Sequence, residues 1–397
     1  MASQLAIDGG KPIRSVILPY SRQWLDEDDI KAVVNVLRSD WLTTGPKVQE
    51  FEETFAVLTG VKYSVAVSSG TAALHSAMFA LGIGPGDEVI IPAMTFAATA
   101  NAVVFQGGKP VFADVDENTL LIDTAQVEAK VTPSTKAVIA VDYAGQPCDY
   151  NALRRIAERH GLLLVADACH ALSATYEGRR VGTLGDLNIF SFHPVKHITT
   201  GEGGMITTNS PEFAERMRIF RNHGITTDHH QRGKQGSWFY EMIDLGYNYR
   251  LTDIQCALGM SQLPKLSKWV ARRQEIARRY NAAFAEYPVL KSLEVRRDIS
   301  HAYHLYVIKL NLNQLQVDRS KVFNALRAEG IGVNVHYIPV HLHPFYRRHF
   351  GTGPNNCPVA EAAYEQLLSL PIFPQMRDQD IDDVISSVKK VCNAYQK

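Results

Sequence analysis

The stretch Ser191-Phe-His-Pro-Val-Lys196, followed by the loop His197-Ile-Thr-Thr-Gly-Glu-Gly-Gly204, decides the interpretation of this chain. It places one lysine after an apolar segment at 187–192, which is typical of a buried β-strand, and ahead of a glycine-rich loop. A lysine in such a place is partly desolvated, which disfavours its charged form and makes the free amine available as a nucleophile. Because lysines are mostly exposed, an ordinary solvated loop residue is the competing interpretation of Lys196.

A second candidate, Asp167, ends the apolar run at 162–167. Open α/β sheets bind their ligands at the carboxyl ends of parallel strands, so an acid in this place is a candidate ligand group. A carboxylate there can keep a heterocyclic nitrogen protonated. The alternative is that Asp167 only caps a following helix.

The segment Tyr63-Ser-Val-Ala-Val-Ser-Ser-Gly70-Thr-Ala-Ala73 predicts a strand, a tight turn and the start of a helix. Free N–H groups at a helix start attract anions, and small residues let a phosphate come close. An ordinary strand-turn-helix junction is the alternative. Together, the lysine, the acid and this turn supply the three groups that pyridoxal phosphate requires.

From about residue 64, short apolar strands alternate with helix-length segments such as 150–160. The strands are expected at 88–92, 110–114, 136–141, 162–166, 187–192 and 205–208. This alternation predicts an α/β fold with a mostly parallel central sheet and helices on both faces. An amphipathic helix is expected at 26–39 in the segment that precedes this scaffold.

A long polar helix is expected at 263–286, where it leads the chain into a second unit. There we expect strands at 303–310 and 332–336 and helices at 321–329 and 360–368, which is the pattern of a smaller α+β domain. The predicted division is a large domain at 1–262, which includes the N-terminal segment, and a small C-terminal domain at 263–397.

The composition excludes several classes of function. With 41 basic and 41 acidic side chains, the chain has no electrostatic basis for binding nucleic acid or an anionic membrane. It has no signal-like N-terminus and no apolar run of about 18 residues, which predicts a soluble cytoplasmic protein. The five cysteines form no C-x-x-C pair, so reduced thiols are expected rather than disulfides or zinc.

Three other patterns in the sequence concern metal sites and a mobile segment. The run that starts at Asp114 resembles a calcium loop but has Thr119 where glycine is required, so we expect no calcium site. The histidines at 336, 341 and 343 lack a recognisable zinc spacing, and we expect a polar rim of the active site instead. The charged segment 228–234 predicts a mobile loop, with a lid over the substrate as the alternative.

Over nearly its whole length the sequence resembles the DegT/DnrJ family of sugar-nucleotide aminotransferases, within the fold type I pyridoxal phosphate enzymes. The motifs that carry the resemblance are Trp41-Leu-Thr-Thr-Gly45, Gly70-Thr-Ala-Ala73, Asp167-Ala-Cys-His-Ala171, the Lys196 segment and Gly246-Tyr-Asn-Tyr-Arg-Leu-Thr-Asp-Ile-Gln-Cys-Ala257. The segments 141–145 and 192–204 also resemble the subgroup that makes UDP-4-amino-4,6-dideoxy-N-acetyl-β-L-altrosamine for pseudaminic acid. That subgroup has proline after the lysine, where this chain has His197.

The resemblance implies an aspartate aminotransferase-like fold and a role for each matching residue. Lys196 would carry the cofactor and Asp167 would pair with its ring nitrogen. Phe96, at the start of a small-residue helix, would stack on the ring, and His170 would bind the ring oxygen. Gly70, Thr71 and Ser191 would hold the phosphate, and Asn248 would reach it from the partner subunit of a homodimer with shared active sites.

The implied activity is transfer of an amino group from L-glutamate to C4 of a UDP-linked 2-acetamido-2,6-dideoxy-4-ketohexose. One alternative is a sibling enzyme that acts on another 4-ketosugar nucleotide, of the bacillosamine or perosamine type. An alternative of another class is a non-catalytic regulator that binds the cofactor or the sugar nucleotide. A dehydratase variant of the family has histidine in place of the lysine, so Lys196 argues against both non-transaminase readings.

Overall fold

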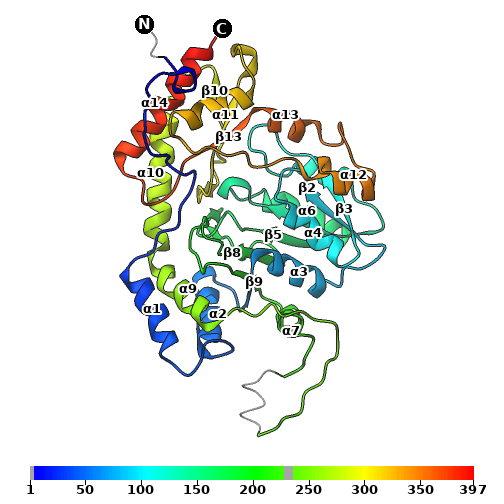
Figure 1. Ribbon diagram of the computed structural model, residues 1–397. Helices are drawn as coiled ribbons and strands as arrows, with labels where there is room; N and C mark the ends of the chain where they lie inside the picture. Colours follow the sequence, from blue (N-terminus) through cyan, green and yellow to red (C-terminus); the bar gives the residue numbers. More distant parts are fainter. Residues whose placement is uncertain (1–3, 228–235) are drawn as a thin grey trace.

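The structure, a computed structural model, describes residues 4–227 and 236–397 (Figure 1). The predicted loop at 228–234 lies outside the described residues. Within the described part, no helix is long and apolar enough to cross a membrane.

Seven strands form the central sheet in the order β1-β9-β8-β5-β4-β2-β3. The strands are β1 (Tyr63–Val67), β2 (Glu88–Pro92), β3 (Lys109–Ala113), β4 (Thr135–Val141), β5 (Leu163–Asp167), β8 (Leu187–Ser191) and β9 (Gly204–Thr208). Four neighbouring pairs are parallel, whereas β9 runs antiparallel to both β8 and β1. The prediction of an α/β fold with a mostly parallel sheet is confirmed.

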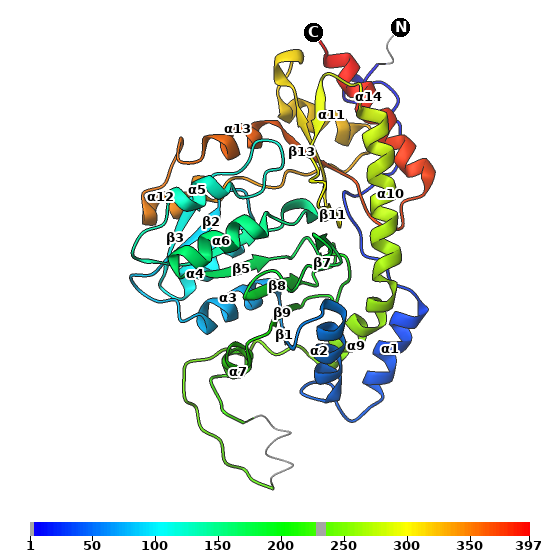
Figure 2. The same ribbon diagram turned by 180° about the vertical axis from the view of Figure 1, so that it is seen from behind.

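Helices cover both faces of this sheet. On one face lie α3 (Gly70–Ala80), α4 (Ala97–Phe105) and α7 (Pro211–Phe220), and on the other lie α5 (Thr124–Ala129) and α6 (Tyr150–His160). α3 packs between α4 and α7, and Figure 2 shows α5 and α6 from their own side. Nine of the eleven residues of α3 are buried, because the helix is apolar on all sides and forms the middle of its layer.

The second unit contains a three-stranded antiparallel sheet in the order β10-β12-β13. Its elements are α10 (Leu266–Phe284), β10 (Leu290–Ser292), β12 (Tyr306–Leu310), α11 (Arg319–Ala328), β13 (Leu367–Leu370) and α14 (Asp378–Tyr395). Both ends of the described chain lie at this unit, beside α14 (Figure 1).

The remaining elements are short or lie around the two sheets. They are the helices α1 (Glu27–Leu37), α2 (Pro46–Thr59), α9 (Asp253–Gln262), α12 (Pro344–Phe350) and α13 (Pro358–Gln366), the 3-10 turns η1 (Ala6–Asp8), η2 (Tyr143–Gly145), η3 (Leu263–Lys265), η4 (Leu312–Gln314) and η5 (Val340–Leu342), and the strands β6 (Thr175–Tyr176), β7 (Arg179–Arg180) and β11 (Ile299–Ser300). The amphipathic helix expected at 26–39 is α1, with Asp26 as its N-cap.

Three expected elements of the second unit have different bounds. The helix expected to reach Leu368 ends at Gln366, because the next two leucines are buried as part of β13 and pair with β12. The strand expected from Tyr303 begins only at Tyr306, since Tyr303 has a left-handed backbone with φ of 47°. The segment 332–336 was expected to be a strand and instead contributes an isolated bridge from Asn334 to Ser369.

Two hydrophobic cores lie under the two sheets, and α10 contributes to both. Trp269 and Val270 belong to the core of the large sheet, whereas Tyr280 and Phe284 belong to the core of the small sheet. The domain boundary at residue 262 stays a prediction.

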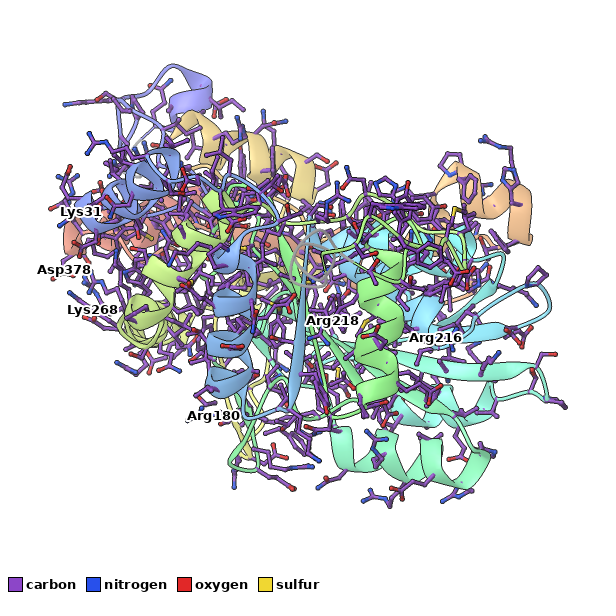
Figure 3. All side chains as sticks on the ribbon, turned by 90° about the horizontal axis from the view of Figure 1, so that it is seen from below. Lys31, Arg180, Arg216, Arg218, Lys268 and Asp378 are labelled. Atoms are coloured by element: carbon purple, nitrogen blue, oxygen red, sulfur yellow. The ribbon has the colours of Figure 1, made fainter. Side chains whose placement is uncertain are left out.

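Helix α7 is held against its neighbours by arginines. Arg218 donates to the Glu52 carboxylate on α2 (3.5 Å) and to the carbonyl of Ser64 (3.3 Å). Arg216 lies 5.4 Å from the centre of the Phe79 ring and donates to the Phe79 carbonyl (3.1 Å). Figure 3 shows both arginines on α7, from below. These contacts fix α7 against α2, α3 and β1.

Two of the motifs noted in the sequence meet at Asp253, the buried first residue of α9. One oxygen of its carboxylate accepts a hydrogen bond from the N–H of Gly45 (2.7 Å) and the other accepts from the N–H of Lys47 (2.9 Å). Gly45 lacks a side chain that could cap α2, so Asp253 satisfies N–H groups at the start of that helix. A Cβ atom at Gly45 would lie 2.5 Å from the Asp253 carboxylate, so glycine is required there.

We expect Asp253→Ala to lower the free energy of unfolding by about 3 kcal/mol, because two buried N–H groups lose a charged acceptor. Urea unfolding at fixed protein concentration, followed by circular dichroism, measures the change. Asp253→Asn is the matched control and should lose less, since its amide oxygen still serves one of the two N–H groups. An Asp253→Ala protein with an unchanged midpoint would show that the shared cap does not stabilise the fold.

Candidate active site

Lys196 lies in the loop that joins β8 to β9. The N–H of Phe192 donates to the carbonyl of Gly203 (2.9 Å), and the N–H of Thr200 donates to the carbonyl of Phe192 (3.0 Å). The Phe192 ring is fully buried, so both ends of the loop are fixed to the core. The loop therefore holds the lysine at the end of the strand, as the sequence predicted.

The Lys196 amine is surrounded by polar groups from distant parts of the chain. Its Nζ lies 3.4 Å from Nε2 of His304 and near the side chains of Asp167 and Cys169. Burial by these surroundings lowers the pKa of Lys196, and the negative charge of Asp167 opposes part of that change. The geometry thus favours an amine that loses its proton more readily than an exposed lysine.

Asp167 ends β5 and is buried. Thr99 Oγ1, on α4, donates to Oδ2 of the carboxylate (2.8 Å), and the N–H of Cys169 donates to Oδ1 (3.3 Å). The chain continues into turns at 168–173, so Asp167 does not cap a helix there. The carboxylate is held in one orientation by Thr99, which the sequence analysis had not identified.

The turn after β1 brings Gly70 against the end of β8. A Cβ atom at Gly70 would lie 2.9 Å from Cβ and 3.2 Å from Oγ of Ser191, so a side chain would fill this space. Gly70 opens α3, Thr71 follows it with an exposed side chain, and Ser69 is the N-cap. The structure therefore places Gly70, Thr71 and Ser191 around one helix N-terminus, which is a favourable position for a phosphate.

Phe96 and Tyr337 form an aromatic pair beside His170. Phe96, the N-cap of α4, is 60% exposed, and its ring centre lies 5.9 Å from that of Tyr337. The Tyr337 hydroxyl forms a hydrogen bond with Nε2 of His170 (3.1 Å). Nδ1 of His170 is buried without a hydrogen-bond partner in the described part of the chain. Phe96 thus has a free ring face, and His170 has a free nitrogen.

Sequence reasoning missed His304 and Tyr337. Both come from the segment after α10, and only the tertiary fold brings His304 to Lys196 and Tyr337 to His170. The only available signal for Tyr337 was its position next to His336, for which a polar rim was expected. No pattern in the sequence singles out His304.

His197 forms its hydrogen bond with the backbone rather than with Lys196. It is buried, and its Nε2 donates to the carbonyl of Ala302 (3.0 Å). Burial and the neighbouring charge of Arg273 lower the pKa of His197 well below its usual range. In the structure, His197 therefore forms a hydrogen bond that joins two segments of the chain.

Two of the histidines considered for zinc, His336 and His341, have separate partners. His341 is buried against the carboxylate of Glu361 (2.9 Å), and Nδ1 of His336 forms a hydrogen bond with Ser369 (2.8 Å). Among the residues that the structure describes, no group of three or more potential ligands is placed to hold a metal ion.

Asn248 lies on the arm that follows α7 and has an exposed side chain. Its neighbour Tyr249 accepts a hydrogen bond at its carbonyl from the N–H of Ser68 (2.8 Å), so this part of the arm runs beside the turn that leads to Gly70. An exposed asparagine in this place can serve its own subunit or a second copy of the chain.

These residues fit pyridoxal phosphate. The cofactor has an aldehyde for Lys196, a ring nitrogen for a carboxylate such as Asp167, and a phosphate for the turn at Gly70. The free nitrogen of His170 can meet a polar group of the ring, and Phe96 can stack on its face. The pocket therefore offers a partner of the right chemistry for each part of this cofactor.

The comparisons with known proteins agree. The sequence matches the DegT/DnrJ/EryC1/StrS aminotransferase family over residues 23–389. The spore coat polysaccharide biosynthesis protein SpsC of Bacillus subtilis (strain 168) is 46% identical over 380 residues, which cover 95% of this chain and 98% of SpsC.

Two solved structures have nearly the same fold. Spr1654 from Streptococcus pneumoniae, in its PLP form, superposes with a TM-score of 0.89 at 32% identity, covering 95% of this chain and 99% of that one. PseC of Helicobacter pylori, an aminotransferase of pseudaminic acid biosynthesis, gives a TM-score of 0.89 at 32% identity, covering 96% and 100%. The predicted fold type I architecture is confirmed. The chain therefore belongs to the DegT/DnrJ/EryC1/StrS aminotransferase family, and its cofactor is pyridoxal phosphate.

Proposed function

We propose that the protein transfers an amino group from L-glutamate to C4 of a UDP-linked 2-acetamido-2,6-dideoxy-4-ketohexose. The observation that carries the transaminase chemistry is the desolvated Lys196 amine beside the oriented carboxylate of Asp167. The family membership supports amino transfer, and the similarity to PseC supports a sugar of the pseudaminic acid pathway.

Pyridoxal phosphate, when bound, supplies an electron sink for the transfer. The residues that we propose hold it are Gly70, Thr71, Phe96, Asp167, His170, Ser191, Lys196 and Asn248. Lys196 carries the cofactor between turnovers and moves a proton from the α-carbon of the amino donor. Asp167, oriented by Thr99, keeps the ring nitrogen protonated. Because one amino group is delivered in two half-reactions, the kinetics should be ping-pong.

Five free cysteines, four of them buried, fit a reducing compartment, and we place the enzyme in the cytoplasm.

The role of Lys196 is tested by reducing the cofactor-loaded protein with borohydride and mapping its peptides. We expect the pyridoxyl label on Lys196, because its amine lies in the pocket and loses its proton more readily than an exposed amine. The Lys196→Ala protein, treated in the same way, should carry no label. A label on any other lysine would remove the basis of the mechanism.

The substrate is tested with a panel of UDP- and GDP-linked 4-ketosugars, with mass spectrometry of the products. We expect preference for the UDP-linked 2-acetamido-2,6-dideoxy-4-ketosugar of β-L-arabino configuration. Preference for a GDP-linked or a D-configured ketosugar would instead indicate a sibling enzyme of the bacillosamine or perosamine type. Such a result would leave the transaminase chemistry intact.

The arm after α7 supports a homodimer. Residues 221–227 run beside 239–249 as an irregular ribbon held by isolated bridges and hydrogen bonds, for example between the N–H of Ile243 and the carbonyl of Gly224 (2.9 Å). This ribbon projects from the body of the molecule (Figure 1). Trp238 is 85%, Met242 64% and Leu245 65% exposed. A two-stranded ribbon is marginal in water, and this much exposed apolar surface indicates an interface.

We propose that a second copy of the chain covers the arm, and that Asn248 reaches the phosphate site of that partner. A two-fold interface puts each residue into two equivalent sites, so defects in different residues can be combined. In a mixed dimer of Lys196→Ala and Asn248→Ala subunits, one site then has both lesions and the other has neither.

We expect this mixture to regain activity at limiting cofactor. The Asn248→Ala protein alone should bind the cofactor about ten- to a hundredfold more weakly, because the charged phosphate loses a partner. Steady-state rates of the mixture are compared with those of each parent protein. If Asn248 serves its own subunit, every site in the mixture has one lesion and activity does not recover.

A further inference from the structure

The Lys196 amine has a close polar neighbour to which the proposed function assigns no role. Nε2 of His304 lies 3.4 Å from Nζ of Lys196, within reach of a hydrogen bond. His304 is buried, and its ring centre lies 4.3 Å from that of His170. Hydrogen bonds at catalytic groups are often long before ligands bind, so this distance is compatible with a working contact.

The backbone fixes the His304 ring in this place. The N–H of Leu305 donates to the carbonyl of Ala144 (3.1 Å), and the Arg273 guanidinium donates to the carbonyl of His304 (3.3 Å). At Gly145, with φ of +105°, a Cβ atom would lie 3.0 Å from the backbone nitrogen of His304. Glycine is thus required for this approach, and the imidazole is held on a rigid support.

The position of the proton on His304 follows from its other nitrogen. Nδ1 of His304 is buried and has no hydrogen-bond partner among the described residues. His197, which also lies near Lys196, has the same pattern, and there the assignment is forced. Its Nε2 faces the carbonyl of Ala302, which can only accept, so its proton is on Nε2 and the partnerless Nδ1 is bare. Because buried N–H groups without a partner are rare, the partnerless Nδ1 of His304 is also the bare nitrogen, and the proton of His304 is on Nε2.

We propose that His304 donates a hydrogen bond from Nε2–H to the lone pair of Lys196 Nζ and thereby holds the lysine as an uncharged amine. An ammonium group has no lone pair, so this bond forms only with the deprotonated lysine. The inference rests on the proposed role of Lys196, which needs the free amine to join the cofactor and to take up a proton. Arg273 acts indirectly, by positioning the backbone of His304.

The charges around Lys196 are compatible with an effect of His304 on the protonation of the lysine. The titratable groups that face it are Asp167, Cys169, His170, His197, His304 and His336. Burial raises the pKa of Cys169 and lowers the pKa values of the four imidazoles, so all five are uncharged near neutral pH. The Asp167 carboxylate is therefore the charge that favours the ammonium form, and the His304 bond opposes it.

The test measures the protonation of Lys196 in cofactor-free protein. Acetic anhydride modifies only unprotonated amines, so the pH dependence of Lys196 acetylation, read by peptide mass spectrometry, reports its pKa. His304→Met keeps a side chain of similar size and removes the donor. His197→Met is the matched control, because it removes a neighbouring imidazole that binds Ala302 instead of the lysine.

We expect acetylation of Lys196 at a fixed pH below its pKa to slow about three- to tenfold in His304→Met, because a neutral hydrogen bond to the free amine is lost. The control should retain the wild-type rate. If the pocket acts through burial alone, the more apolar methionine would leave the rate unchanged or raise it. Either of those results would overturn the proposal.

A second measurement needs no variant. Neutron diffraction from crystals of the cofactor-free wild-type protein should show deuterium on Nε2 of His304, and deuterium on Nδ1 alone would contradict the proposal. Neither measurement uses turnover. If the borohydride experiment labels another lysine, the proposed role of Lys196 is wrong. The acetylation rates and the neutron structure report separately on the contact between Lys196 and His304.

Discussion

Asp167 and Lys196 come together because β5 and β8 are neighbours in one particular register. Asp167 lies opposite Ile189, so β8 ends two residues further on, at Ser191, and the loop that carries the lysine begins beside the carboxylate. A slip of one residue would turn every side chain of β8 to the other face of the sheet. The orientation of Asp167 by Thr99 and the approach of Gly70 to Ser191 depend on the same pairing.

The parts of the site that the sequence predicts are those set by local structure. An apolar run that ends in a polar residue marks the carboxyl end of a buried strand, and this is where Asp167 and Lys196 lie. Parallel strands then place such ends along one edge, so their meeting follows from fold class. Gly70 is similar, since a turn of small residues before an apolar helix is a local signal. The resemblance to a family was needed for Phe96 and His170, whose residue types alone are uninformative.

The parts that the sequence does not predict depend on contacts between distant segments. His304 reaches the lysine because Gly145 permits a close backbone approach and Arg273 holds the carbonyl of His304. Neither residue has a pattern that connects it to residue 304. Element boundaries failed for the same kind of reason: Leu367 continues a helical pattern, but pairing with β12 extends the chain there. Whether Asn248 serves a second subunit depends on how two chains assemble, and no local pattern in one sequence indicates that.

Helix α10 has a consequence for the way the protein loses its structure. Its 19 residues, about 28 Å of continuous helix, pack into one core through Trp269 and into the other through Tyr280. If one core melts, the half of α10 that packs in it loses its support, and the half that packs in the second core is weakened as well. The two cores are therefore linked into one cooperative unit. Arg273, midway along the helix, bonds to the carbonyls of His304 and Ile372. Loosening of the small sheet is thereby transmitted through Arg273 to the backbone that supports His304.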